Sequence, residues 1–236
     1  MCLNMLQTVP TGCSAIDKFL GGGIPSESIS LIYGEAETGK TTFAIQCLIS
    51  CALQGHKTLF VDCDGTFSAQ RLSQIASEKF ETVSELTVLM RPNNFQEQTL
   101  VIDQLPNYLA KNFGLVVFDT LTSLYRLKIA ESPKKAFELN RELNRQVALL
   151  AQTARTQKIA VLTASQVHSV FDEHQVSIEP VATRVLKFWA DTIINLKPTE
   201  TPQTIKAVFE KTQKTKQAEL PTFILKIDKT GMHTSV

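Results

Sequence analysis

The sequence of 236 residues predicts an α/β protein with a mostly parallel central sheet and helices on both faces. Runs rich in β-branched residues alternate with helical periodicity through most of the chain, the order expected of such a layered fold. The runs LVVFD at 115–119 and KIAVLTAS at 158–165 are apolar without alternation, which suits central strands covered on both faces. Two further strand-like runs near the end flank a basic stretch and predict a C-terminal β-hairpin.

The expected elements follow from hydrophobic spacing and from the residues that start and stop them. A short helical segment at 17–20 ends at three glycines, which stop a helix. Pro133 suits the first position of a long helix, and Pro106 predicts a kink in an earlier one. Residues 166–181 are polar and are expected to be irregular. We expect strands at 28–33, 57–62, 86–90, 115–119, 158–165, 191–196, 205–210 and 222–228, and helices at 42–54, 70–80, 95–112 and 132–156.

The composition predicts one folded domain over residues 1–236. Hydrophobic residues make up 43% of the chain and the net charge is +1, so disorder and a global basic footprint for nucleic acid are both excluded. The five cysteines form no Cys-x-x-Cys, and the four histidines show no paired spacing, which argues against a disulfide framework and a zinc site. We expect reduced thiols, a cytoplasmic location and no membrane span.

One motif carries specific chemistry. It satisfies G-x-x-x-x-G-K-[ST] between a predicted strand and a predicted helix, which is the context that a phosphate-binding loop requires. Backbone N–H groups and the helix N-terminus would then face phosphate oxygens, the lysine would reach the β- and γ-phosphates, and the threonine hydroxyl would ligate Mg²⁺. The alternative is a glycine-containing turn without a ligand. The expected ATP contacts are Gly34, Glu35, Ala36, Glu37, Thr38, Gly39, Lys40, Thr41 and Thr42.

Polar residues at the carboxyl ends of other predicted strands complete a candidate site. Asp119 would hold Mg²⁺ together with Thr41, unless it only caps the next turn. Asp62 or Asp64 could orient an attacking water, although Asp64 also begins an Asp-Gly turn. Gln166 could touch the γ-phosphate and report it to the segment behind, or it could simply face solvent.

With these residues in place, the chain resembles the RecA family of recombinases, and within it the compact archaeal RadB family. The likeness runs from about residue 11 to residue 231. It implies a RecA-like P-loop NTPase core without the N-terminal helix-hairpin-helix domain of full recombinases. The segments that carry it are TGCSAIDKFLGGGIPSESISLIYGEAETGKT, VDCDGTFSAQRL, LVVFDTLTSLYR, NNFQEQTLVID and SQVH.

The resemblance implies a role for several residues. Arg71 matches an arginine that stacks on adenine, Gln166 matches the γ-phosphate sensor, and Asp64 stands where the family has its catalytic glutamate. Lys40 is implied to act on the phosphates during hydrolysis as well as in binding. Arg126 matches the arginine that opens the first DNA-binding loop. Further DNA contacts are expected from Lys128, Lys134, Lys135 and the lysines of 211–216, with a second DNA loop within 168–180.

Some positions depart from the family pattern. Asp64 is one methylene shorter than glutamate, and a misplacement near 1 Å costs on the order of a hundredfold in rate. Glu37 puts a carboxylate into the phosphate loop. The first DNA loop reads ESPKK instead of Gly-Arg-Gly, and the second contains three acidic residues at 172, 173 and 179, which disfavours phosphate. Because Asp64 replaces the family's glutamate, we expect ATP hydrolysis to be weak or absent.

Three functions stay open. The first is an ATP-binding accessory protein of homologous recombination and DNA repair, which binds single-stranded DNA and assists a RadA-type recombinase. The second is a KaiC-like ATPase that acts on protein partners. The third is a scaffold that binds nucleotide only for stability. Charge runs are usually solvated faces, so the lysines have a plain alternative. A homodimer is also left open.

Overall fold

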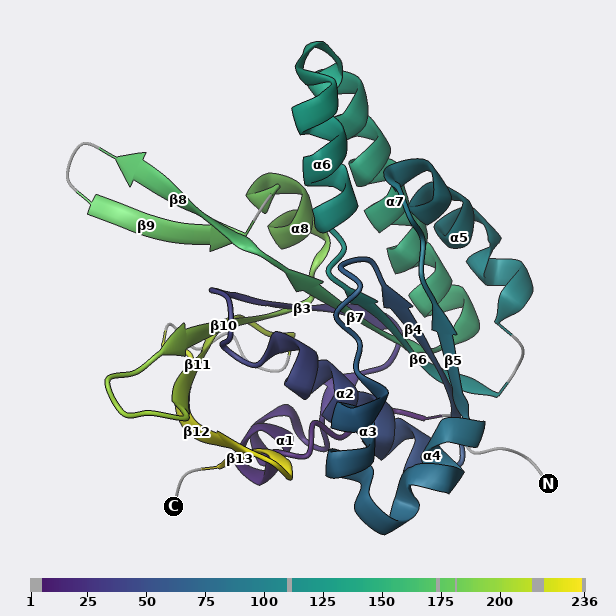
Figure 1. The fold of residues 1–236 in the computed structure, drawn as a ribbon, viewed down its shortest axis with the longest axis vertical. Helices are drawn as coiled ribbons and strands as arrows, with labels where there is room; N and C mark the ends of the chain where they lie inside the picture. Colours follow the sequence, from purple (N-terminus) through teal and green to yellow (C-terminus); the bar gives the residue numbers. More distant parts are fainter. Residues whose placement is uncertain (1–5, 110–111, 173–174, 181, 214–218, 235–236) are drawn as a thin grey trace.

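The computed structural model describes residues 6–109, 112–172, 175–180, 182–213 and 219–234. Within this part of the chain, nine strands form one sheet in the order β13-β12-β11-β10-β3-β7-β6-β4-β5 (Figure 1). The sheet strands are β3 (Ser28–Gly34), β4 (Lys57–Asp62), β5 (Thr87–Met90), β6 (Phe113–Asp119), β7 (Ala160–Ser165), β10 (Thr192–Pro198), β11 (Thr204–Lys211), β12 (Thr222–Asp228) and β13 (Gly231–Thr234). The helices are α1 (Ser14–Leu20), α2 (Lys40–Leu53), α3 (Ala69–Ala76), α4 (Phe80–Glu85), α5 (Phe95–Tyr108), α6 (Ser123–Glu131), α7 (Ala136–Gln157) and α8 (Thr183–Trp189). There are also two 3₁₀ turns in the described residues, η1 (Ser77–Lys79) and η2 (Pro133–Lys135). Two small antiparallel ribbons lie outside the main sheet: β1–β2 (Thr8–Val9 with Ile24–Pro25) and β8–β9 (Val167–Asp172 with Gln175–Pro180).

The sheet confirms the predicted fold class. The strands from β10 to β5 pair in parallel, and β11, β12 and β13 continue the sheet antiparallel beyond β10. The predicted C-terminal hairpin is therefore present as β11–β12 and is part of a longer antiparallel end. All parallel strands point their carboxyl ends to one edge, where ligands of open α/β sheets bind.

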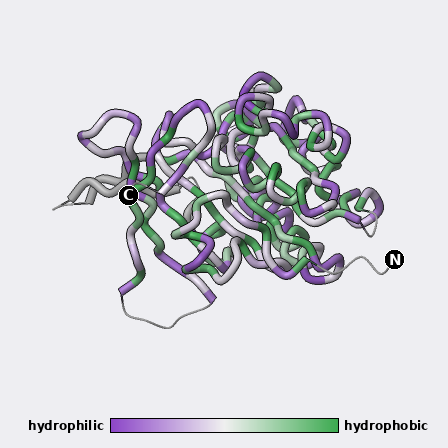
Figure 2. The backbone as a smooth tube through the Cα atoms, turned by 90° about the horizontal axis from the view of Figure 1, so that it is seen from below, coloured by the Kyte–Doolittle hydropathy of each residue, from purple (hydrophilic) through white to green (hydrophobic). Residues whose placement is uncertain are grey.

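Neighbouring residues of one strand are buried in two different hydrophobic cores, one on each face of the sheet. Val116 packs with the helices α5 to α8, whereas Val117 packs with α1 to α4. The same alternation holds in β3, where Leu31 and Ile32 belong to opposite cores. Figure 2 shows the hydrophobic strands running through the middle of the molecule. Both faces of the parallel strands are covered, which explains why their sequences are apolar without alternation.

Most predicted elements are present, and the differences occur where the backbone leaves the helical region. The predicted helix at 70–80 is divided, because Ser77 has a φ of 50° and ends α3 before a 3₁₀ turn and α4 follow. The helix α5 continues through Pro106 but ends at Tyr108, earlier than predicted. Pro133 begins the 3₁₀ turn η2 and not the long helix itself.

Two predicted loops have regular structure. The segment matched to the first DNA loop lies in the helix α6 and the 3₁₀ turn η2, and the polar segment predicted to be irregular forms the β8–β9 hairpin, which projects from the body of the molecule (Figure 1). The expectation of an irregular segment was wrong, because β-branched residues alternate with polar ones in parts of both strands. Residues 173, 174 and 181 of this segment, and 214–218 of the lysine cluster, lie outside the described part of the chain.

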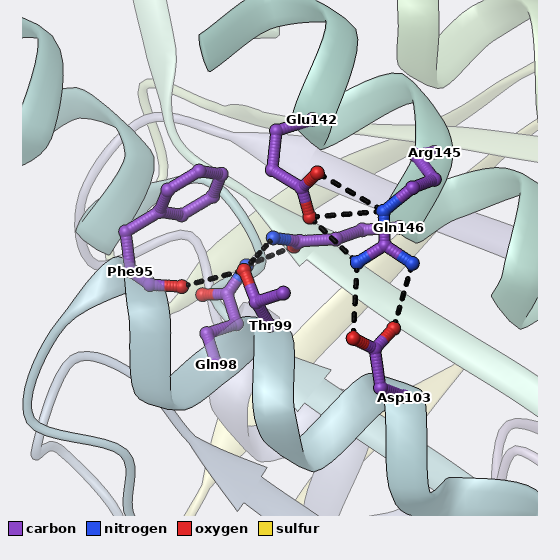
Figure 3. A network of polar contacts seen from close by, with 7 residues as sticks. All are labelled: Phe95, Gln98, Thr99, Asp103, Glu142, Arg145 and Gln146. Carbon is purple, nitrogen blue, oxygen red and sulfur yellow. Dashed lines mark hydrogen bonds and ion pairs between the residues drawn. The ribbon is translucent and has the colours of Figure 1, made fainter.

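A buried amide network ties α5 to α7 (Figure 3). Gln98 donates through Nε2 to the side-chain oxygen of Gln146 at 2.9 Å and to the carbonyl oxygen of Leu121 at 3.1 Å. Both glutamines are fully buried. On the surface above them, Arg145 bridges to Asp103, a contact that adds little because it is exposed. The network fixes the backbone just after the end of β6.

A second buried amide holds the last strand against α2. Gln46 donates through Nε2 to the carbonyl oxygen of Met232 at 3.0 Å and accepts the Met232 backbone N–H at 2.8 Å. A Cβ at Gly12 or Gly231 would lie within 3.0 Å of this amide, so only glycine leaves room for it. One side chain of α2 thus contacts segments from both ends of the chain.

The described cysteines are buried thiols. Cys13, Cys47, Cys51 and Cys63 are free and buried, and burial raises the pKa of Cys13 and of Cys51 to about 12. Among the residues that the structure describes, no helix combines the length and the apolar character needed to cross a membrane.

Candidate functional site

The motif residues 34–41 form a tight loop between β3 and α2. Thr38 donates through its hydroxyl to the carbonyl oxygen of Glu35 at 2.9 Å, which closes the turn. Glu37 and Gly39 both have positive φ, at 63° and 88°, and α2 begins at Lys40. The first turn of α2 therefore opens directly onto the loop, with N–H groups that have no partner inside the helix.

Close packing against backbone requires the glycine at 34, and the left-handed φ of 88° favours the glycine at 39. A Cβ at Gly34 would lie 2.3 Å from the carbonyl oxygen of Leu196 in the neighbouring strand β10. A Cβ at Gly39 would lie 2.7 Å from side-chain carbons of Ile227 and Met232. The loop is thus fixed against β10 on one side and against the C-terminal strands on the other.

Three side chains of the site already contact one another or the loop. The Lys40 ammonium donates to the carbonyl oxygens of Gly34 at 2.9 Å and Glu35 at 2.5 Å. The Thr41 hydroxyl donates to Asp119 Oδ2 at 2.6 Å. Lys40 and Thr41 open α2 and Asp119 ends β6, so the carboxyl edge of the sheet brings them together as the sequence predicted.

A cavity of about 410 Å³ lies at this point. Its wall includes the phosphate loop, the end of β6 and the residues after β4 and β7. The predicted Asp64, Asp119 and Gln166 all line it together with Lys40 and Thr41. The cavity is also lined by Thr66, Thr120 and Val167, which were not predicted from the sequence. Thr120 and Val167 each follow a predicted site residue, so adjacency was the signal available for them.

Burial shifts the charges of the cavity. It raises the pKa of Asp119 to about 6, and the nearby carboxylates of Asp64 and Asp62 add to this shift, while the Thr41 hydroxyl and Lys40 oppose it. Burial also lowers the pKa of Lys40, against the opposing effect of Asp119, Asp64 and Glu35. Carboxylates are thus crowded at an edge where a cation would relieve their repulsion.

The structure gives different surroundings to Asp62 and Asp64, of which the family resemblance selected Asp64 as the catalytic position. Asp62 is fully buried and is occupied by an ion pair with Arg91 at 2.6 Å and by the backbone N–H groups of Thr66 and Phe67. It therefore holds the turn after β4. Asp64 instead lines the cavity and accepts the Thr120 hydroxyl at 3.0 Å.

Gln166 links the cavity to α6. Its Nε2 donates to Asp64 Oδ2 at 3.3 Å, and its Oε1 accepts the guanidinium of Arg126. Val167, the next residue, begins β8. One chain of contacts therefore joins Gln166, Asp64 and Arg126, which were predicted to sense phosphate, to act in catalysis and to bind DNA.

A second cavity of about 560 Å³ adjoins the phosphate loop. Ala36 lines both cavities, and Arg71 from α3 lines the second. The Arg71 guanidinium donates to the carbonyl oxygens of Asp228 at 2.8 Å and Lys229 at 3.0 Å. Arg71 therefore lies beside the phosphate loop, in a cavity that adjoins the first one.

The remaining predicted cations lie on α6 and after it. Arg126 is exposed on α6, and Lys128 forms a surface ion pair with Glu131 at 3.0 Å. Lys134 and Lys135 are exposed in η2, and the described residues offer them no ion pair. Lys211 differs from the expectation of a free cation, because its ammonium donates to the carbonyl oxygen of Ala190 at 2.5 Å.

The residues of the first cavity fit a nucleotide with Mg²⁺. The hydroxyl of Thr41 and the carboxylate of Asp119 are oxygen donors of the kind that Mg²⁺ prefers. The glycine at 34 lets the loop backbone lie against β10 without a side chain in between. These observations match the donor set and the shape that a phosphate-binding loop needs.

Comparisons with known proteins agree with this geometry. The family model described as Rad51 matches residues 4–232. The DNA repair and recombination protein RadB of Thermococcus onnurineus is 35% identical over 204 residues, which are 85% of this chain and 87% of that protein. Its counterpart in Methanosphaera stadtmanae is 33% identical over 190 residues, which are 80% of each chain.

A solved structure supports the same assignment. The crystal structure of the RadB recombinase matches with a TM-score of 0.81 and 32% identity, covering 97% of this chain and 100% of that chain. The resemblance noted from the sequence motifs is therefore confirmed over nearly the whole chain. Its phosphate loop, its sheet order and these matches together show that the chain belongs to the Rad51 family and, within it, to the archaeal RadB group.

Proposed function

We propose that this protein is an ATP-binding and DNA-binding accessory protein of homologous recombination and DNA repair, which assists a RadA-type recombinase. The relatives at 33% and 35% identity are named DNA repair and recombination proteins, which supports the biological role. The contact chain from Asp64 through Gln166 to Arg126 supports the mechanism, because it joins the nucleotide cavity to a cationic helix.

The nucleotide would be held by the phosphate loop. Lys40 would exchange its two loop carbonyls for β- and γ-phosphate oxygens, and the loop N–H groups would face the phosphates. Thr41 and Asp119 would hold Mg²⁺, which supplies positive charge that neutralises the phosphates. Arg71 would lie against the base.

Occupancy of the cavity would change the contacts of Gln166. One amide group contacts both Asp64 and Arg126, and its NH₂ has a second hydrogen for a phosphate oxygen, so a bound phosphate would draw the Gln166 amide toward itself. The amide then turns or shifts, and its contact with Arg126 changes with it. Because β8 begins at the next residue, the same movement reaches the β8–β9 hairpin. ATP would thus alter the surface that binds single-stranded DNA.

Hydrolysis would be slow. Asp64 is shorter than the glutamate that the family places there, and its carboxylate accepts the Thr120 hydroxyl. A carboxylate held in this way is poorly placed to orient a water molecule. The protein would then act as a switch set by binding and not by rapid turnover.

The test is a titration of a fluorescent single-stranded oligonucleotide with and without Mg·ATP, combined with an ATP hydrolysis assay on the same sample. We expect Mg·ATP to change the DNA affinity by about fivefold or more, a usual coupling magnitude, while turnover stays slow. DNA should change the ATP affinity by the same factor, because binding linkage is reciprocal.

Two variants serve as controls. Lys40→Ala removes the ammonium that would contact the phosphates, so ATP affinity should fall about 100-fold and the nucleotide effect on DNA should disappear. Lys57→Ala removes an exposed lysine at the start of β4 and should change neither. Fast ATP turnover without DNA binding would favour the KaiC-like ATPase. A DNA affinity that does not change when nucleotide is added would favour the scaffold.

A further inference from the structure

The tip formed by α6, η2 and the start of α7 exposes apolar side chains. Phe137 is 74% exposed and Leu127 is 61% exposed. Phe137 and Phe188, at 74% and 73%, are the two most exposed large hydrophobic side chains in the described part of the chain. A single exposed apolar side chain needs no explanation, but Phe137 shares the tip with the exposed Leu127 and with exposed lysines.

The fold places these two side chains at a similar height of one helical hairpin. The Tyr125 hydroxyl donates to Asn140 Oδ1 at 2.6 Å, which sets the level at which α6 and α7 cross. Leu127 and Phe137 each lie two or three residues beyond that bond toward the connecting turn. The inner side of the hairpin is filled by Ile129 and Leu139, which pack against the core. The outer side chains are therefore not needed to hold the hairpin together.

Positive charge surrounds the exposed phenylalanine. Lys134 and Lys135 precede it by three and two residues, and neither has an ion-pair partner among the described side chains. The cations of the tip outnumber its acids by two. The cations are Arg126, Lys128, Lys134 and Lys135, and the acids are Glu131 and Glu138.

We infer that Phe137 is a base-stacking residue for single-stranded DNA, with Lys134 and Lys135 contacting the phosphates on either side. This inference rests on the proposed DNA-binding function and adds a residue whose ring stacks on the faces of the bases. An exposed aromatic ring beside free cations is the arrangement by which proteins bind single strands without sequence preference. In a duplex, paired and stacked bases offer no free face to the ring.

The charge around Phe137 favours DNA over a protein partner. Lysine is depleted at the centres of protein interfaces, where its desolvation is unfavourable. At this tip two lysines lie two and three residues before the aromatic residue. Phosphates accept such lysines without removing them from water, and stacking then needs only one face of the ring.

The experiment compares two probes that differ only in their bases. One is a fluorescent oligothymidylate of about 20 nucleotides, longer than a usual single-strand site, and the other is a matching chain of abasic deoxyribose phosphates. Both are titrated with the full chain in Mg·ATP. We expect the wild-type protein to bind the oligothymidylate more tightly, and Phe137→Ala to lose roughly tenfold in affinity for it, the order that one stacked base contributes. Affinity for the abasic probe should stay unchanged.

Matched variants separate stacking from general damage. Phe137→Trp should keep the preference for bases and, beside the single tryptophan of the natural chain, add a fluorescence signal that the oligothymidylate quenches. Tyr108→Ala removes a 52% exposed aromatic at the far end of α5 and should leave both affinities unchanged.

Three outcomes overturn the inference in distinguishable ways. If the wild type binds neither probe, the proposed function fails together with the inference. If the wild type binds DNA in a nucleotide-dependent way and Phe137→Ala weakens both probes equally or neither, only the stacking role fails. If Phe137→Ala keeps DNA affinity but loses binding to a RadA-type recombinase or to a second copy of the chain, the tip is a protein interface.

Discussion

The carboxyl edge of the sheet and the tip of the α6–α7 hairpin are two candidate binding regions built in opposite ways. At the edge, Lys40, Thr41 and Asp119 are buried or half-buried and already bonded to the protein. At the tip, Lys134 and Phe137 are exposed and make few contacts. A ligand at the edge must replace existing contacts, whereas a ligand at the tip only adds new ones. Substitutions at the edge should therefore change the stability of the protein, and substitutions at the tip should change only what it binds.

The largest expected effect is at Asp62. Asp62→Ala leaves Arg91 and two backbone N–H groups without their acceptor, and the free energy of unfolding should fall by about 3 kcal/mol. Asp64→Ala, two residues away, removes only contacts inside the open cavity and should change stability by less than about 1 kcal/mol. Urea unfolding measures both. Equal losses for the two variants would show that the edge is not divided into a structural and a functional carboxylate.

An effect of similar size and opposite sign is expected from Asp119 in metal-free protein. Its pKa is raised from 3.8 to about 6 on folding, so its ionised form is disfavoured in the folded state and the penalty is fully present above pH 6. Asp119→Asn should therefore raise the free energy of unfolding at pH 7 by about 3 kcal/mol relative to wild type. That advantage should shrink as the pH falls from 6 toward 4, where the wild-type carboxyl is protonated in the folded state.

The measurement is the unfolding free energy of both proteins in a chelating buffer across this pH range. Added Mg²⁺ should stabilise the wild type and not the variant, since only the carboxylate carries the charge. A constant difference between the two proteins at all pH values would mean that Asp119 titrates normally.

The smallest effect is expected at the tip. Replacing Arg126, Lys134 and Lys135 together by alanine should leave stability unchanged and weaken binding of single-stranded DNA about tenfold at low salt. The slope of log affinity against log salt should fall by about 2, since each phosphate contact on a single strand contributes roughly 0.7. A control triple variant at the exposed Lys18, Lys57 and Lys79 changes the net charge equally and should keep the slope. Equal slopes in the two triple variants would place the DNA elsewhere.

Sequence was sufficient where the information is local. The strand β4 has the predicted bounds, because its apolar residues are continuous and a turn follows at once. The phosphate loop could be predicted because Gly34, Gly39, Lys40 and Thr41 are the fixed positions of one eight-residue motif and the flanking elements were recognisable. The meeting of Thr41 with Asp119 also followed, since parallel strands end at one edge.

Sequence was insufficient where a distant contact decides a residue's role. Residue spacing alone did not separate Asp62 from Asp64, and only the family resemblance selected Asp64, because the ion pair that occupies Asp62 comes from Arg91, 29 residues away. The contact of Gln166 with Arg126 spans 40 residues and depends on how α6 lies against β7. The helix α6 was missed because a loop was expected from the family pattern, although nothing in SLYRLKIAE stops a helix.

The side-chain amide of Gln46 has a practical consequence for anyone who alters the ends of this chain. It serves as a hydrogen-bonding partner for the Met232 backbone, as a neighbouring strand would. A chain truncated before Gly231 would leave the buried Gln46 amide facing an empty space. Gln46 lies on α2, whose first residue, Lys40, contacts the phosphate loop. Tags and truncations should therefore leave both Gly12 and the last strand in place, because changes at the termini are transmitted to α2 and so to the nucleotide site.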